Sequence, residues 1–225
     1  MLQKIDNKKY IFFYLIIFII LSSIHNSNFK NYNFFTIKKI EVVGLNETDN
    51  LLLENKLTNL IGSNIFSLNK DSFKLINTVN LIKSYDVKKI YPNQVKVNLE
   101  PAVAISVVIY FNEKVILGNN GKIIYLKNLP KNVPEVTGTN DINKVFQTIK
   151  IFNKSNFDIK NIKKINFFPS ERIDIELEND KKIKFPINLT IRSLNFSRRL
   201  IEKEEFNKSK IIDLRIPGKI ITYDK

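Results

Sequence analysis

The sequence predicts an α+β protein with a single N-terminal transmembrane helix and two small domains outside the membrane. Three observations lead to this fold class. An uncharged and almost wholly apolar run occupies residues 10–24. Residues 36–103 follow the order strand, helix, helix, strand, strand, and residues 104–225 read as short alternating strands with two helical stretches. A chain of 225 residues is long enough to build two small cores.

The apolar run indicates a membrane anchor. Fifteen residues rise only about 22 Å as a helix, so uncharged flanking residues must join the run to span a hydrocarbon core of about 30 Å. We therefore assign residues 1–9 to a cytoplasmic tail and residues 10–28 to the transmembrane helix. Lysines precede the run, and none follows it before Lys30. The positive-inside rule then predicts a single-pass type II inner-membrane protein with its N-terminus in the cytoplasm and its domains in the periplasm.

A cleaved signal peptide is the alternative for this segment. Its cleavage site should present small residues in an A-x-A-like pattern. The first alanine is Ala102, and only Ser22, Ser23 and Ser27 follow the apolar run at a suitable place. We favour an uncleaved anchor, with His25, the single histidine, as a polar residue at the membrane boundary.

The first domain, residues 36–103, begins with a strand over residues 36–45 that Gly44 ends. We expect Thr48 to cap the helix that follows and Gly62 to end it. The apolar residues Leu53, Leu57, Leu60 and Ile61 share the buried face of this helix.

A second helix is predicted with Asn69 as its cap and with Phe73 and Ile76 on its buried face. Two strands close the domain, over residues 83–92 and 94–101. This order makes a complete small β-α-α-β-β domain.

The second domain, residues 104–225, is predicted as a mixed sheet of about six strands with two helices. A strand at residues 104–111 precedes a hairpin for which Asn120-Gly121 is expected to form a type I′ turn. Helical spacing then appears in residues 141–154, strand patterns in residues 162–169, 172–180 and 181–186, and a last helix in residues 190–206. The apolar residues at helical spacing are Ile142, Val145, Phe146 and Ile149.

The chain ends on a strand pattern, in which Ile212 and Leu214 alternate with Asp213 and Arg215. Pro217-Gly218 favours a type II turn, which does not match the twist of a hairpin, so we expect a bend within one strand. A terminal strand with unpaired backbone groups is a template for another chain. An ordinary strand paired inside its own sheet is the alternative.

Composition and motifs argue against catalysis and against nucleic-acid binding. The formal charge of +14 comes mostly from lysines scattered singly, which favours a solvated surface. With no cysteine and one histidine, there is no disulfide, thiolate metal site or histidine triad. S-x-x-K occurs at residues 27–30 and 67–70, as chance allows in a lysine-rich chain, without K-T-G or S-D-N companions. Asp174 and Glu176 share one face of a strand, which we interpret as the wet face of a sheet. We predict no catalytic residue, cofactor or metal.

Short motifs in both domains resemble the bacterial cell division family FtsQ, also called DivIB. The first domain carries VVG at residues 42–44, KKIYP at 88–92 and LEPAVA at 99–104, and is similar to the POTRA domain of that family. The second carries, in the family's order, GKII at residues 121–124, LP at 129–130, VTG at 136–138 and IDLR at 212–215. The resemblance extends over nearly the whole chain.

The resemblance implies a divisome scaffold at the division septum that links early and late division proteins. Its terminal strand would receive a strand from an FtsB-like partner in complex with an FtsL-like protein, and its POTRA domain would contact other division proteins. By position, the implied partner-binding residues are Arg215, Ile216, Ile220, Ile221, Thr222 and Tyr223. No small-molecule substrate or cofactor is implied. The alternatives are a POTRA-containing periplasmic assembly or chaperone factor and a membrane-anchored cell-wall enzyme.

Overall fold

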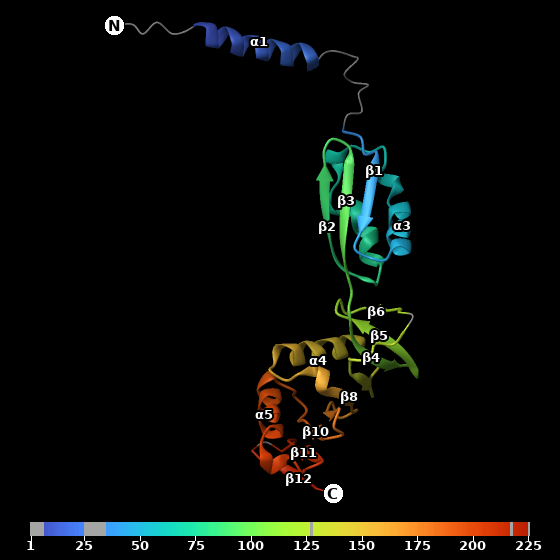
Figure 1. Ribbon diagram of the computed structural model, residues 1–225, viewed down its shortest axis with the longest axis vertical. Coiled ribbons are helices and arrows are strands. Elements are labelled where there is room, and N and C mark those ends of the chain that lie inside the picture. The colour runs from blue at the N-terminus through green and yellow to red at the C-terminus, as the bar shows by residue number, and fades with distance from the viewer. Residues whose placement is uncertain (1–6, 25–34, 127, 217, 225) are drawn as a thin grey trace, which may run out of the picture.

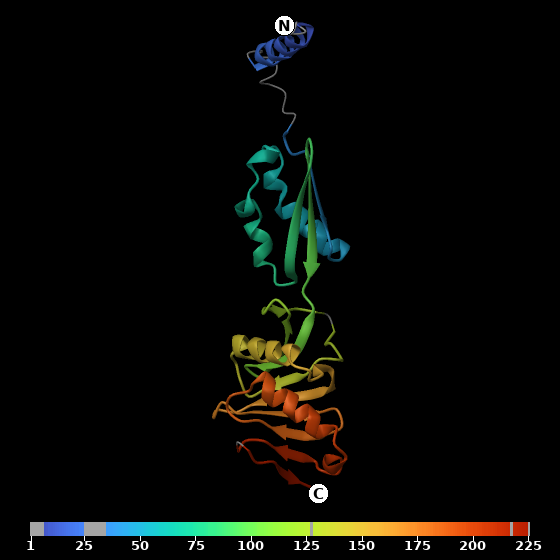
Figure 2. The same cartoon turned by 90° about the vertical axis from the view of Figure 1, so that its left-hand side faces the viewer.

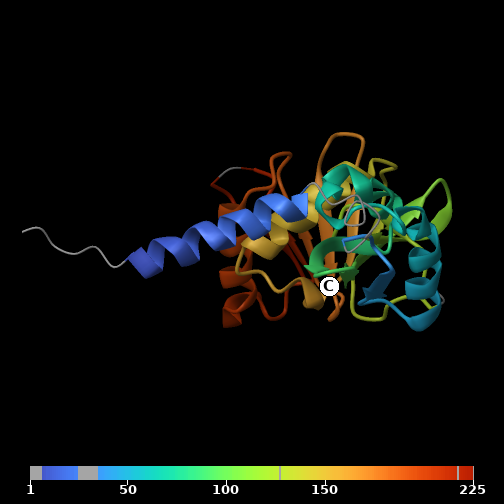
Figure 3. The same ribbon diagram turned by 90° about the horizontal axis from the view of Figure 1, so that it is seen from above.

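The computed structural model describes residues 7–24, 35–126, 128–216 and 218–224. Helix α1 (Asn7–Ile24), the first domain and the sheet domain follow one another along the long axis of the chain (Figures 1 and 2). We call residues 104–225 the sheet domain. Viewed along the long axis, the first domain overlies the sheet domain (Figure 3).

Helix α1 overlaps the predicted transmembrane helix, residues 10–28, as far as Ile24, and it begins at Asn7, within the predicted tail of residues 1–9. Residues 1–6 of the predicted tail and residues 25–28, including His25, lie outside the described residues. Across the described part of the chain, none of the helices has both the length and the apolar character that a membrane crossing requires.

The first domain has the predicted β-α-α-β-β order. Its strands are β1 (Lys39–Val43), β2 (Ile82–Ile90) and β3 (Gln94–Pro101), and its helical segments are α3 (Glu47–Lys56), η1 (Thr58–Leu60), η2 (Ile65–Ser67) and η3 (Lys70–Thr78). The sheet order is β1-β3-β2, with β1 parallel and β2 antiparallel to β3. The second predicted helix is a 3-10 helix, η3.

Of the two helix caps predicted in this domain, the cap of η3 is confirmed and the cap of α3 is wrong. Asn69 caps η3, and its side chain accepts a hydrogen bond from the Ser72 amide. The predicted Thr48 cap is wrong, because Asn46 has the extended backbone of a cap and accepts from the Asp49 amide at 2.8 Å. Since α3 ends at Lys56 and η1 continues with a tighter pitch, Leu53 and Leu57 are buried as predicted and Leu60 packs partly buried against the core, but Ile61 is 46% exposed.

Within its described residues, the sheet domain holds nine strands rather than about six, in the order β12-β11-β10-β9-β8-β7-β4-β5-β6. The strands are β4 (Ala104–Tyr110), β5 (Glu113–Gly118), β6 (Ile123–Ile124), β7 (Glu135–Thr137), β8 (Ile162–Phe167), β9 (Ile173–Leu177), β10 (Lys182–Lys184), β11 (Ile211–Asp213) and β12 (Ile221–Tyr223). The helical segments are α4 (Ile142–Lys154), η4 (Ile159–Asn161), α5 (Ile191–Ile201) and η5 (Glu204–Phe206).

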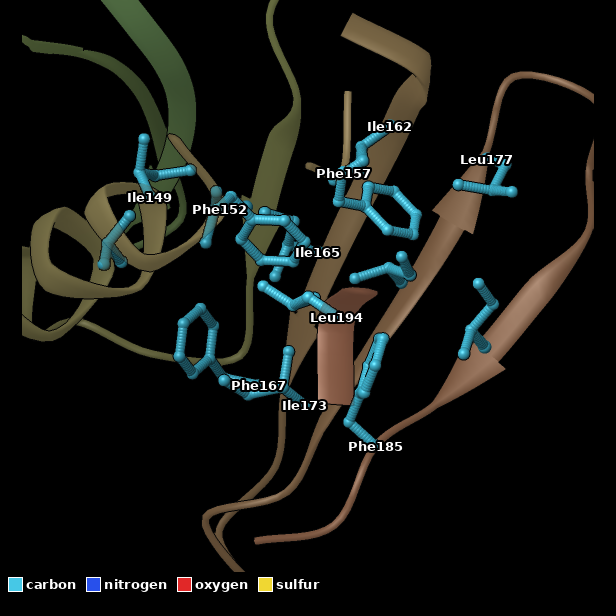
Figure 4. Close-up of a cluster of buried hydrophobic side chains, with 14 of the residues drawn as sticks. Ile149, Phe152, Phe157, Ile162, Ile165, Phe167, Ile173, Leu177, Phe185 and Leu194 are labelled. Carbon is cyan, nitrogen blue, oxygen red and sulfur yellow. The ribbon is translucent and has the colours of Figure 1, made fainter. Parts of the chain in front are cut away.

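One row of aliphatic side chains crosses this sheet and forms its core beneath α4 and α5. Strand register places in this row Val108, Val136, Ile165, Ile175, Ile183 and Ile212, all of which have 0% exposure. The two helices lie on one face of the sheet (Figure 2), and their side chains Ile149, Phe152 and Leu194 pack into the same cluster (Figure 4). On β8, β9 and β10 the other face carries polar residues, among them Lys164, Glu176 and Lys182.

The predicted type I′ turn at Asn120-Gly121 is wrong, although the chain does reverse there between β5 and β6. Only Gly121 of the pair has a positive φ, +78°. Positive φ at two successive residues, as a type I′ turn needs, occurs instead at Phe111 and Asn112 between β4 and β5. The difference has a physical reason, because the Asn120 side chain forms contacts with the first domain.

Asn120 joins the two domains by hydrogen bonds. Its Nδ2 donates to the carbonyl oxygens of Asn80 at 2.8 Å and of Ile82 at 2.9 Å. Asn80 Nδ2 in turn donates to the carbonyl oxygen of Ile123 at 2.9 Å, and Lys122 Nζ donates to that of Asn77 at 2.5 Å. The β6 edge of the sheet domain is thereby fastened to the first domain.

We expect Asn120→Ala to loosen this junction, because it removes two of the hydrogen bonds and leaves two carbonyl groups to water. Spin labels on cysteines introduced at Lys74 and Lys154 would report the interdomain distance, since the chain has no other cysteine. The distance distribution should broaden in Asn120→Ala and stay narrow in the control Asn140→Ala, whose side chain accepts from Phe111 within the sheet domain. Equal distributions in all three proteins would contradict the prediction.

Candidate partner-docking edge

The chain ends in a hairpin, not in the bend within one strand that the sequence predicts. Strand β11 pairs in parallel with β10 on one side and antiparallel with β12 on the other. The Lys219 amide donates to the carbonyl of Ile216 at 3.1 Å, and Gly218 has φ +75°, so the chain turns here. The paired strands end at Asp213 and Ile221, so this turn does not join them directly and the reversal is longer than a two-residue hairpin. Pro217 itself lies outside the described residues.

Strand β12 is one edge of the nine-stranded sheet, and within the described residues no strand pairs with its outer side. Thr222 lies opposite Ile212 and so continues the buried row toward the helix-covered face. Ile221 lies opposite Asp213 and Tyr223 opposite Ile211, which places both side chains on the other face. Thr222 and Tyr223 are exposed, and Ile221 is half-buried.

Arg215 lies on this polar face and holds Asp213 in place. Arg215 Nη2 lies 2.5 Å from Asp213 Oδ2, and Nε donates to Oδ1 at 2.8 Å. Asp213 is only 3% exposed. The hydrogen bond from Arg215 holds the pKa of the Asp213 carboxyl below its ordinary value, against the opposing effect of burial.

The carboxylates Asp174 and Glu176 belong to ion-paired rows on the same face. Asp174 lies opposite Lys184, which lies opposite Asp213, so charges of alternating sign cross three strands. Burial raises the pKa of Asp174, although Arg172 Nε lies 3.1 Å from its carboxylate. Glu176 has Lys163 and Lys182 each at 3.5 Å. These carboxylates pair with neighbouring lysine and arginine side chains and do not face a common cleft.

Ile216 and Ile220 line a groove on the helix-covered side, between the 214–220 loop and α5. The groove has a volume of about 610 Å³, and Leu214 and Phe196 also line it. Ile216, Ile220 and Phe196 are 49%, 40% and 40% exposed. Arg192, Arg199 and Lys219 make its wall positive. The six residues expected from the sequence thus divide among the β12 edge, the polar face and this groove.

Sequence reasoning missed Asp213, Lys184 and Phe196 as neighbours of the docking edge. Lys184 Nζ lies 5.9 Å from the centre of the Tyr223 ring, although 39 positions of sequence numbering separate them. That contact depends on the parallel pairing of β10 with β11, which no local pattern shows. For Phe196, the sequence shows only an aromatic residue on the helix that precedes the last strands.

No group of three or more His, Cys, Asp or Glu side chains suited to a metal ion occurs among the residues that the structure describes.

Asp213→Asn should change how stability depends on pH. Because the pKa of Asp213 is lowered on folding, the ion pair stabilises the fold above the ordinary carboxyl pKa of about 4, and this contribution disappears as the pH falls through the lowered value. The thermal midpoints of wild type and Asp213→Asn should therefore differ most near neutral pH and converge in acid. A difference that is constant with pH would mean that Asp213 acts by packing and not by charge.

The fold and this edge define a class: a POTRA-bearing protein whose second domain offers a terminal strand. Residues 35–100 match the family model described as "POTRA domain, FtsQ-type". This match confirms the predicted resemblance for the first domain, which is similar to the POTRA domain of the FtsQ/DivIB family. The first domain is called the POTRA domain from here on.

Comparison with solved structures includes the major extracytoplasmic domain of the trans isomer of the bacterial cell division protein DivIB from Geobacillus stearothermophilus. It is 16% identical, with a TM-score of 0.33, over 46% of this chain and 89% of that chain. No curated protein matches the sequence.

Proposed function

We propose that the chain is a non-enzymatic divisome scaffold that receives a strand of an FtsB-like protein, itself paired with an FtsL-like protein, along the outer side of β12. The observation that carries this proposal is the position of β12 at the end of a nine-stranded sheet, with one side unpaired in the described part of the chain. Strand addition uses such an edge, because backbone hydrogen bonds supply affinity and side chains at alternate positions supply specificity.

The side chains on the two faces of β12 indicate which side chains an added strand would carry. On the polar face it meets Ile221 and Tyr223, two positions apart, which favour apolar or aromatic side chains as cross-strand neighbours. On the other face it meets Thr222 and the groove lined by Ile220 and Phe196. Since Arg192, Arg199 and Lys219 surround that groove, an apolar segment with acidic flanks is the complementary ligand.

The location of the protein is part of this proposal. Residues 10–28 would anchor it in the inner membrane, with the N-terminus in the cytoplasm and both domains in the periplasm at the septum. The FtsQ-type POTRA match supports this class of protein, and the POTRA domain would contact other division proteins.

Titration of the full chain in detergent with an FtsB-like peptide tests the docking edge. Truncation after Pro217 should abolish binding, but it also makes β11 the new edge of the sheet. Proline substitutions are therefore the sharper probe. Backbone N–H groups of successive residues point to opposite sides of a strand, so one of Ile221→Pro and Thr222→Pro removes an outward donor. We expect that variant to weaken binding by roughly 30-fold or more, which corresponds to about 2 kcal/mol.

Matched alanine substitutions at the same two positions are the controls. They keep the backbone donor and should weaken binding less than the prolines do, because strand addition depends chiefly on the main chain. Circular dichroism must show the fold unchanged in each variant. Equal binding by the intact chain, the truncated chain and both proline variants would move the docking site away from β12.

A further inference from the structure

Three chain segments meet at the end of the POTRA domain that lies nearest to α1 in the figures (Figures 1 and 2). The Ile65 amide donates to the carbonyl of Phe35 at 2.8 Å, and the Ile37 amide donates to that of Ser63 at 2.9 Å. The Lys38 amide donates to the carbonyl of Asn93 at 2.8 Å, which brings in the turn between β2 and β3. Backbone hydrogen bonds therefore hold the three segments together at this end of the POTRA domain.

Aromatic rings from all three segments pack against one another on this surface and remain exposed. The ring centres of Phe35 and Phe66 lie 4.9 Å apart, and those of Phe66 and Tyr91 lie 5.3 Å apart. These side chains are 43%, 57% and 55% exposed. Ile61 and Ile90, at 46% and 44%, are further exposed apolar residues of the same segments. We call Phe35, Phe66 and Tyr91 the aromatic end.

The three segments that carry the aromatic end are rich in lysine. Residues 35–40, 61–70 and 88–94 contain lysines and neither aspartate nor glutamate; the lysines are Lys38, Lys39, Lys70, Lys88 and Lys89. Lys39 forms a 3.7 Å ion pair with Glu41, and Lys89 donates to the carbonyl of Leu68, whereas Lys38 and Lys88 are exposed. Glu47, Asp49 and Glu100 lie near the other end of β1 and β3, whereas Glu41 pairs with Lys39 and Lys96, and Asp71 follows Lys70 and pairs with Lys74.

The covalent chain limits how far the aromatic end can be from α1. Residues 25–34 connect Ile24 to Phe35, and the eleven steps between these two residues can reach at most about 40 Å. A helix of mostly apolar side chains thus lies within this distance of a surface made of aromatic rings and lysines. Aromatic residues gather at the headgroup level of membranes, and lysines near them are attracted to anionic lipids.

We propose that the aromatic end of the POTRA domain rests on the headgroup region of an anionic membrane, with Lys38 and Lys88 facing the lipid phosphates. The proposal rests on the anchored location given above for the identity of the membrane. It adds a second, reversible contact, which holds the POTRA domain against the bilayer and points the sheet domain away from it.

A single tryptophan tests this contact, because the natural chain contains none. Phe66→Trp in the full chain is mixed with vesicles containing anionic lipid and a headgroup-level quenching lipid. Phe111→Trp is the matched control, since Phe111 is 67% exposed on a hairpin of the sheet domain. We expect quenching of the tryptophan at position 66 to exceed that at position 111 several-fold. Vesicles without anionic lipid, or the double substitution Lys38→Glu with Lys88→Glu, should reduce it.

Flotation of the same samples separates this inference from the proposed anchor. If the chain floats with the vesicles and the tryptophan at position 66 is not quenched, the surface contact is wrong and the anchor stands. A chain that does not float refutes both. Shielding of that tryptophan from an aqueous quencher in the absence of lipid would show that protein covers the aromatic end, which also overturns the proposal. The β12 titration is unaffected by any of these outcomes.

Discussion

Gly138→Ala is expected to destabilise the sheet domain by roughly 3–5 kcal/mol, enough to unfold a domain of ordinary stability. Gly138 has φ +84°, and a Cβ built there would lie 1.9 Å from the carbonyl oxygen of Phe167. It follows β7, which pairs in parallel with β8 at the centre of the sheet. The close approach is between two backbones, so a rotamer change cannot relieve it. Binding of the FtsB-like peptide should be lost with the fold.

Urea unfolding of the wild type, Gly138→Ala and Gly218→Ala measures this effect. Gly218 is the matched control, because its φ is +75° and nothing lies within 4 Å of a Cβ built there. Its substitution should cost only the left-handed backbone strain of about 1–2 kcal/mol. Similar losses in the two variants would mean that strain alone matters and that the contact with Phe167 does not.

Gly44→Ala should have a comparable effect on the POTRA domain and leave the sheet domain folded. A Cβ at Gly44 would lie 2.0 Å from the carbonyl oxygen of Leu99, and φ there is +122°. Gly44 follows β1 just as Gly138 follows β7, and each strand pairs in parallel with the strand that supplies the carbonyl. We expect a loss of roughly 3–5 kcal/mol in this domain, a loss of quenching at the aromatic end and unchanged peptide binding at β12.

Hydrogen exchange resolved by residue distinguishes the two domains. In Gly44→Ala, amides of Val42 and Val97 should lose protection, while those of Ile175 and Ile212 should keep it. Gly62→Ala is the control, with φ +88° and no atom within 4 Å of the added Cβ. Loss of protection in both domains would show that they unfold as one unit.

The sequence predicts elements whose partners are close in the chain. The POTRA strands, the Asn69 cap and the buried residues Phe73 and Ile76 follow from turn residues, caps and periodicity within short windows. The two V-x-G motifs are visible as well. The sequence does not show why these positions need glycine, because the group that leaves no room for a Cβ is a carbonyl on a strand far along the chain.

What the sequence does not predict depends on long-range pairing. Strand β7 has three residues and β6 has two, too few to show an alternation, and their neighbours come from elsewhere in the sheet. Asn120-Gly121 has the sequence of a type I′ turn, but the contacts of Asn120 with Asn80 and Ile82 fix another geometry. In the docking edge, burial of Asp213 requires Arg215 to fold back over it, which an alternating pattern cannot show.

The order of strands also sets a length. Strand β6 abuts the POTRA domain through the bond from Asn80 to Ile123, and β12 is the opposite edge of the same sheet. With neighbouring strands about 4.8 Å apart, nine of them hold the last edge roughly 40 Å from the first. The number of strands therefore sets how far β12 lies from the POTRA domain, and a partner bound to β12 as proposed would meet the protein at this fixed distance.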